Sequence, residues 1–259
     1  MPVLDFGMVV HGCIDGSSHL VPYLRCENNN RASTVFEMFV RATSVYGIPS
    51  RVRSDHGLEN LHVALFMNMV RGNQRGSHIT GRSVHNQRIE RFWRDVHTQV
   101  LITFKDVFYG LVDSDQLDVE NHSHLQALHA VYVPVINNRL ELFRQAWNMH
   151  KMTSDAAQRT PEQQWIDGML SNAGSDKRAV NSVFQGETVE RTLSEILTQQ
   201  GLHPEPFGDL ADENNLVGNL DVVPQLLPEQ LNEFHVAVEG ITDLQQRYII
   251  ALNLFGTLE

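Results

Sequence analysis

Apolar and polar positions along the first 70 residues follow two different periods, and the change between them predicts the order of secondary structure. Residues 6–15 (FGMVVHGCID) and 19–27 (HLVPYLRCE) are apolar, β-rich runs joined by Gly-Ser-Ser, a pattern typical of a β-hairpin. Residues 31–46 carry apolar side chains at helical spacing, and the glycine and proline that follow predict the end of that helix. A short strand over residues 50–55 and a second helix over residues 59–70 are predicted next.

A long amphipathic helix is predicted after a polar connection. Residues 72–81 are rich in Gly, Arg and Ser without a hydrophobic period, which predicts a mobile basic loop, and Ser83 is placed to cap the helix that follows. Glu90 lies off the apolar stripe of this helix and shares a face with Asn86 and Arg94. The stripe and its aromatic neighbour are predicted to face the core: Ile89, Phe92, Trp93, Val96 and Val100.

The remainder of the chain is predicted to be mostly helical. Residues 122–150 predict a helix broken near Pro134, and residues 159–170 predict a capped helix with Pro161 in its first turn. From Ser171 the composition shifts towards Asn, Asp, Glu, Gln, Gly and Pro.

Three regions follow from these patterns. We expect a core over residues 1–170, a linker over residues 171–227 with one amphipathic helix at 189–199 and an acidic loop, and a C-terminal helical segment over residues 228–259. The order strand, strand, helix, strand, helix, basic loop, long helix predicts an α/β fold, with helices around a central sheet.

Charge is unevenly distributed along the chain. The net charge is −11, but residues 1–110 hold 12 Lys and Arg against 9 Asp and Glu, while residues 111–259 hold 8 against 22. The first segment is therefore +3 and the second −14. Within residues 71–94 there are six arginines and one acid, Glu90. Such a patch is typical of a phosphate-binding surface, and a solvated basic surface is the alternative.

Composition also limits where the protein works. No run of 18 apolar residues predicts a membrane helix, and the N-terminus lacks the pattern of a signal peptide. Cys13 and Cys26 alone make neither a disulfide framework nor a zinc site, so we expect buried free thiols in a reducing compartment, the nucleus or the cytoplasm.

Asp55 and Glu90 are the candidate metal ligands. Asp55 ends a predicted strand and Glu90 lies on a helix 34 intervening residues later, so an α/β sheet can bring both to its carboxyl edge. Two carboxylates about 4 Å apart repel by roughly 4 kcal/mol, and a hard cation such as Mg²⁺ or Mn²⁺ would relieve this. Taken singly, Asp55 is more typical of a turn and Glu90 of a surface ion pair, and only their combination with the basic segment between them favours a metal site.

Histidines offer a weaker signal. His122, His124 and His129 could form a metal cluster on one helix, but we favour solvent-facing positions for them.

The run GIPSRVRSDHGLEN (47–60), the gap of 34 residues and SVHNQRIERFWRDV (83–96) resemble the catalytic core of retroviral-type integrases and transposases, over roughly residues 6–170. The segment RTPEQQW (159–165) resembles the end of such cores. The resemblance implies a ribonuclease-H-like fold, DNA as partner, DNA integration by metal-dependent strand transfer, and homo-oligomeric assembly.

The same resemblance implies roles for individual residues. Asp55 takes the place of the second acid of an Asp-Asp-Glu triad and Glu90 that of the third. The other site residues are expected to contact DNA, although Asn86 is equally a first-turn residue: Arg82, Asn86, Arg88, Arg91 and Arg94.

The first acid of that triad is not evident. Asp15 follows what resembles the second strand of the family, so we expect the first strand and its aspartate upstream of Met1, with Asp15 as the alternative. Two functions therefore remain open. One is an integrase-like enzyme, and the other is a domesticated, non-catalytic DNA-binding or oligomerisation module.

Overall fold

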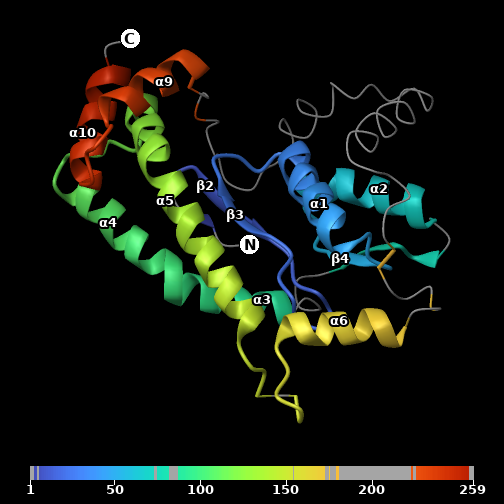
Figure 1. Ribbon diagram of the computed structural model, residues 1–259. Helices are drawn as coiled ribbons and strands as arrows, with labels where there is room; N and C mark the ends of the chain where they lie inside the picture. The colour runs from blue at the N-terminus through green and yellow to red at the C-terminus, as the bar shows by residue number, and fades with distance from the viewer. Residues whose placement is uncertain are drawn as a thin grey trace, which may run out of the picture.

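A computed structural model of the chain describes residues 3–4, 6–72, 75–81, 87–153, 155–172, 175, 179–180, 223 and 226–256 (Figure 1). Helices surround two small sheets in it, which makes the fold mixed α/β as expected. Within these residues, no helix combines the length and the apolar character that crossing a bilayer requires.

Three antiparallel strands form the first sheet, in the order β1 (Val3–Leu4), β2 (Met8–Gly12) and β3 (Leu24–Glu27). The predicted hairpin is confirmed: Val9 lies opposite Glu27 and Gly12 opposite Leu24. The strand after the turn is shorter than predicted, since it begins only at Leu24. Whether a further strand lies upstream stays a prediction.

Two parallel strands, β4 (Val52–Ser54) and β5 (His78–Thr80), form the second sheet. They are joined by a 3₁₀ turn, η1 (Leu58–Asn60), and by α2 (Leu61–Arg71), as the helical pattern predicted. The prediction of a plain loop over residues 72–81 was wrong, because this segment contains β5. Strand pairing overrides its low β-propensity: Val52 N–H donates to the Ser77 carbonyl and Gly81 N–H to the Ser54 carbonyl, at 2.9 and 3.1 Å.

A small core lies between α1 (Ala32–Tyr46) and α2, and Val52 of β4 packs against it. The helix ends at Gly47, as the sequence predicted. The positive φ of 79° at this residue is one that glycine adopts readily. Edge-to-face aromatic contacts join Phe66 of α2 to Phe36 and Phe39 of α1. We call this cluster the small core: Val35, Phe36, Phe39, Ile48, Val63, Phe66 and Met67.

The large core is built on the other side of the first sheet, around α3 (Gln87–Val96), the π-helical turn η4 (His97–Leu101), α4 (Ile102–Asp113) and α5 (His122–Met149). The predicted stripe is confirmed, with its members buried or packed against this core: Ile89, Phe92, Trp93, Val96 and Val100.

The predicted break at Pro134 is wrong, because α5 continues through it. Pro134 is exposed, whereas the buried positions on both sides of it, such as Tyr132 and Ile136, pack in the large core. Burial on both flanks therefore outweighs the hydrogen bond that the proline removes.

Two asparagines of α5 bond the backbone around β3. Asn137 accepts from Cys26 N–H at 2.8 Å and donates to the Cys26 carbonyl at 2.9 Å. Asn148 makes the same pair of bonds with Val21, at 2.8 and 3.0 Å. The Asn137 amide thus replaces a neighbouring strand at the edge of the sheet, and the Asn148 amide pairs the chain just before β3 in the same way.

The C-terminal helices α9 (Pro228–Ala237) and α10 (Leu244–Phe255) complete the large core (Figure 1). Tyr248, Ala251 and Phe255 of α10 are buried there, and α10 packs against α5. The predicted helix at residues 189–199 lies outside the described residues, and the expected region boundaries stay a prediction.

The helix over residues 159–170 is confirmed as α6 (Pro161–Ser171), capped by Thr160 with Gln163 in a reciprocal capping box. The solvent-facing position expected for His129 is wrong. His129 is 7% exposed, its Nε2 bonds the Phe6 carbonyl at 2.7 Å, and burial lowers its pKa. It therefore holds the β1–β2 turn, where Phe6 adopts a positive φ of 70°.

Candidate metal and nucleic-acid site

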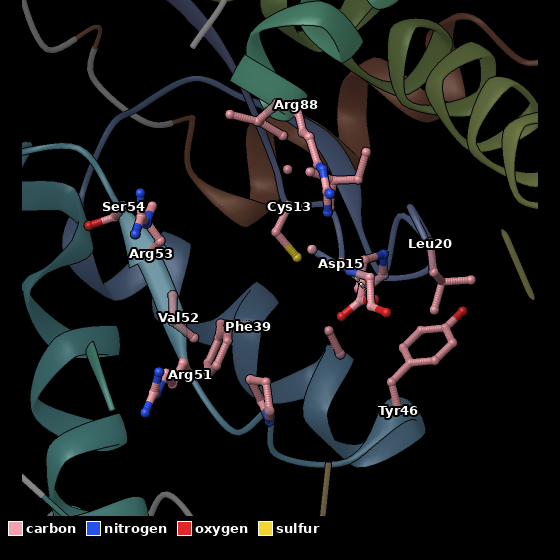
Figure 2. Close-up of a pocket in the computed structure, with 18 of the residues that line it drawn as sticks. Cys13, Asp15, Leu20, Phe39, Tyr46, Arg51, Val52, Arg53, Ser54 and Arg88 are labelled. Carbon is pink, nitrogen blue, oxygen red and sulfur yellow. Dashed lines mark hydrogen bonds between the residues drawn. The ribbon is translucent and has the colours of Figure 1, made fainter. Parts of the chain in front are cut away.

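A cleft of about 1270 Å³ opens between the end of β2 and strand β4. Figure 2 shows Cys13, Asp15 and Arg88 on one side of it and the side chains of β4 on the other. Residues from both cores reach its walls, with Trp93 from the large core and Phe39 from the small core. Because the two cores do not close over this space, polar side chains can gather in it. Four acids line it: Asp15, Asp55, Glu59 and Glu90.

Asp55 lies directly after β4, as the sequence predicted, and lines the cleft. Its Oδ1 accepts a hydrogen bond from Asn60 Nδ2 at 3.2 Å. The same Nδ2 donates to Glu59 Oε1 at 3.0 Å, so one amide joins two carboxylates. The turn from β4 into α2 therefore fixes the Asp55 side chain at the cleft wall.

Glu59 was missed by sequence reasoning. It is 8% exposed, and burial, followed by the negative charge of Asp55, raises its pKa. The signal that could have revealed it is the spacing Asp55-x-Gly57-x-Glu59, which returns a second acid towards the first around a single turn.

Glu90 and Arg88 lie in the first turn of α3 and both line the cleft. Both are exposed, consistent with positions off the buried stripe of the helix. Figure 2 shows the Arg88 side chain extending from α3 towards the loop that holds Asp15. The same cleft therefore receives Asp55 from the sheet and Glu90 from the helix.

The other predicted DNA contacts fall into two groups. Arg91 and Arg94 are exposed on α3 but are not among the residues that line the cleft. Arg82 and Asn86, like the proposed cap Ser83, lie outside the described residues.

Three further arginines line the cleft, and the prediction of DNA contacts did not include them. Arg51 and Arg53 flank Val52 of β4 and are exposed, and Arg75 reaches Ser50 Oγ with Nη2 at 3.2 Å. The alternation Arg51-Val52-Arg53 was the available signal, because residues two apart on a strand share one face.

Asp15 also reaches the cleft, but its carboxylate is engaged in its own turn. Oδ2 accepts from Ser17 N–H, Ser18 N–H and Ser18 Oγ, at 3.0, 2.7 and 2.8 Å. This is a turn-stabilising Asx arrangement, and it leaves less of this carboxylate for a cation than Asp55 has.

The chemistry open to this cleft is that of oxygen ligands and arginines. Burial raises the pKa of the Cys13 thiol to about 12, which makes it a poor nucleophile at neutral pH. Carboxylate oxygens are the type of ligand atom that Mg²⁺ and Mn²⁺ prefer. In the part of the chain that is described, however, no three His, Cys, Asp or Glu side chains gather as a metal-binding group.

The α/β fold and the cleft lined by four acids and several arginines define the candidate site. The chain matches the family described as integrase core domain over residues 1–179, and it belongs to that family. Members of this family typically use divalent metal ions. No curated protein and no solved structure matches the chain.

Proposed function

We propose that this chain is a DNA-integrating core that acts by metal-dependent phosphoryl transfer, with Asp55 and Glu90 as metal ligands. The observation that carries the proposal is that one cleft is lined by both acids and by arginines from two different elements. Membership of the integrase core domain family supplies the reaction class.

The strand pattern supports a ribonuclease-H-like arrangement. Consecutive antiparallel strands β1, β2 and β3 are followed by α1 and then by the parallel strands β4 and β5 with a helix between them. The family resemblance assigns the second acid to Asp55, which directly follows β4, and the third to Glu90, in the first turn of α3, and these locations support the proposal. The location of the first acid, upstream of Met1 or at Asp15, stays a prediction.

Asp55 and Glu90 are the residues that would hold a divalent cation. When bound, such an ion supplies charge stabilisation to a phosphate group under attack and activates the attacking hydroxyl. The chain's own contribution is positional: Asn60 fixes the Asp55 carboxylate, and α3 presents Glu90 across the cleft.

The arginines provide the path for the DNA backbone. Arg88, Arg51 and Arg53 line the cleft, whereas Arg91 and Arg94 lie exposed further along α3. Neutralised phosphates release counterions, so binding should weaken steeply with salt. With DNA as substrate we expect a nuclear or cytoplasmic protein that assembles as a homo-oligomer, which sedimentation analysis can test.

A second candidate function is a DNA-binding or oligomerisation module without catalysis. One observation favours it: within the described residues no three potential ligands form a metal-binding group. Loss of one ligand from a metal site lowers the rate steeply while leaving phosphate contacts in place.

A nicking assay separates the two candidates. Supercoiled DNA is incubated with the wild-type chain, with Asp55→Ala and with Asp95→Asn, an acid of α3 that does not line the cleft. The enzyme proposal expects Mg²⁺-dependent nicking that Asp55→Ala abolishes and Asp95→Asn retains. Equal nicking by wild type and Asp55→Ala refutes a catalytic role for Asp55. Salt-sensitive binding without any nicking favours the second candidate.

A further inference from the structure

The Asp55 carboxylate is tied to a buried second acid by one amide group. Asn60 Nδ2 bonds both Asp55 Oδ1 and Glu59 Oε1, one through each of its two protons. Turning this amide over would place its oxygen against two carboxylates, so the pair of acids decides the orientation of Asn60. In that orientation the amide donates to Asp55 Oδ1.

Gly57 makes room for this arrangement. Its backbone, at φ −67° and ψ 138°, is in the ordinary extended region, so no unusual dihedral requires a glycine. A Cβ at this position would instead lie 2.1 Å from both Oε1 and Oε2 of Glu59. An alanine here would therefore displace the Glu59 carboxylate, which is the end of a flexible side chain, from its place beside Gly57.

The Glu59 carboxylate is therefore held from two directions. It lies against Gly57 and accepts a hydrogen bond from Asn60. At 8% exposure it is enclosed, whereas Asp55 beside it is only partly buried. The more deeply buried of these two cleft-lining acids is thus held in place beside the more accessible one.

We propose that Glu59 and Asn60 are positioning residues for Asp55. Glu59 fixes the Asn60 amide, the amide fixes Asp55 Oδ1, and the Oδ2 atom is left to bind the divalent cation. Gly57 contributes as well, because its missing side chain leaves space for the Glu59 carboxylate. The inference rests on the proposed function, since it takes Asp55 as a metal ligand.

Direct Mn²⁺ binding by the full chain, measured by titration calorimetry without DNA, tests this inference. Asn60→Ala and Gly57→Ala are expected to raise the Kd for Mn²⁺ about tenfold, the lower end of the usual effect for partners of metal ligands. Glu59→Gln keeps an oxygen for Asn60 and is expected to bind nearly as the wild type does. Asn68→Ala, on α2 and away from the cleft, is the matched control.

Each outcome separates one explanation from another. If Glu59→Gln loses as much affinity as Asp55→Asn, Glu59 is itself a ligand and the positioning role is wrong. Asn60→Ala and Gly57→Ala could instead bind Mn²⁺ as the wild type does, with circular dichroism confirming that they are folded. In that case the positioning inference is wrong, while the metal site of the proposed function stands. If even Asp55→Asn leaves Mn²⁺ binding unchanged, the metal site of the proposed function fails with it.

Discussion

Polar groups at the edge of β3 and at the end of β4 differ in how completely they are hydrogen-bonded. Asn137 of α5 bonds both the N–H and the carbonyl of Cys26 in β3, and Asn148 does the same for Val21 just before that strand. After β4, the structure gives Asp55 one side-chain partner within the described part of the chain. One edge is closed by a helix, and the other opens on a cleft.

This difference shows where stability and chemistry are separated in the fold. Fully paired polar groups beside a large apolar core stabilise the chain and bind nothing. Acids and arginines at an open cleft contribute little to stability, because exposed charges interact weakly. Substitutions in the large core and at the β3 edge should therefore lower the free energy of unfolding. Substitutions in the cleft should instead change ligand binding in a protein that stays folded.

The largest loss of stability is expected in the large core. Phe108 is fully buried and packs edge to face against Phe6 and Tyr132. Phe108→Ala removes this packing and leaves a cavity, which should lower the free energy of unfolding by about 3–5 kcal/mol. Val107→Ala, on the exposed side of the same helix, is the control. Equal effects of the two substitutions in urea unfolding would contradict the assignment of the core.

A smaller loss is expected at the β3 edge. Asn137→Ala leaves the Cys26 N–H and carbonyl without their partners, at a cost of about 1–3 kcal/mol. The neighbouring Asn138 is exposed, and Asn138→Ala should have almost no effect. Chemical denaturation of both variants measures the difference. If only Asn138→Ala lowered the free energy of unfolding, the polar groups at the β3 edge would not depend on Asn137.

Stability should also depend on the protonation of His129. Burial lowers its pKa, so the folded state favours the neutral ring, and the unfolded chain takes up a proton first. The stabilisation is complete above the ordinary pKa of His, near 6.5, and is lost as the pH falls below it. His129→Gln keeps a donor for the Phe6 carbonyl without titrating, so its unfolding free energy should fall less between pH 7 and pH 5. An unchanged pH dependence would rule out this role.

The smallest effect on stability is expected for the exposed arginines of α3, in and beside the cleft. Charge reversal of Arg88, Arg91 and Arg94 should change the free energy of unfolding by less than about 0.5 kcal/mol each. DNA affinity should nevertheless fall, with the salt slope reduced by about 1 per arginine. Arg139→Glu, at an exposed position of α5, is the control. Fluorescence anisotropy at several salt concentrations measures both quantities, and unchanged affinity in all three variants would defeat the predicted DNA contact.

Local patterns predicted much of this fold. The hairpin, α1 with its glycine stop, the buried stripe of α3 and the Thr160 cap of α6 follow from periods and signals that need no distant partner. Asp55 and Glu90 were also chosen from such patterns, as a strand end and the polar side of a helix.

The failures depend on contacts that are distant in sequence. Strand β5 exists because β4 supplies its hydrogen bonds, and α5 passes through Pro134 because residues on both sides are buried. His129 is buried against Phe6, 123 positions away along the chain. Glu59 was missed for a different reason: the spacing Asp55-x-Gly57-x-Glu59 was overlooked, and the burial of Glu59 beside Gly57 depends on how the turn after β4 folds back.

The claim on which the account depends is that Asp55 and Glu90 share one cation in the cleft. Fe²⁺ can replace Mg²⁺ at oxygen sites, and with ascorbate and peroxide it cuts the polypeptide close to where it is bound. Mass spectrometry of the fragments should find cuts near residue 55 and near residue 90, both lost in Asp55→Asn and both suppressed by excess Mg²⁺. Cuts near only one of these positions, or cuts that persist in Asp55→Asn, would contradict a shared site.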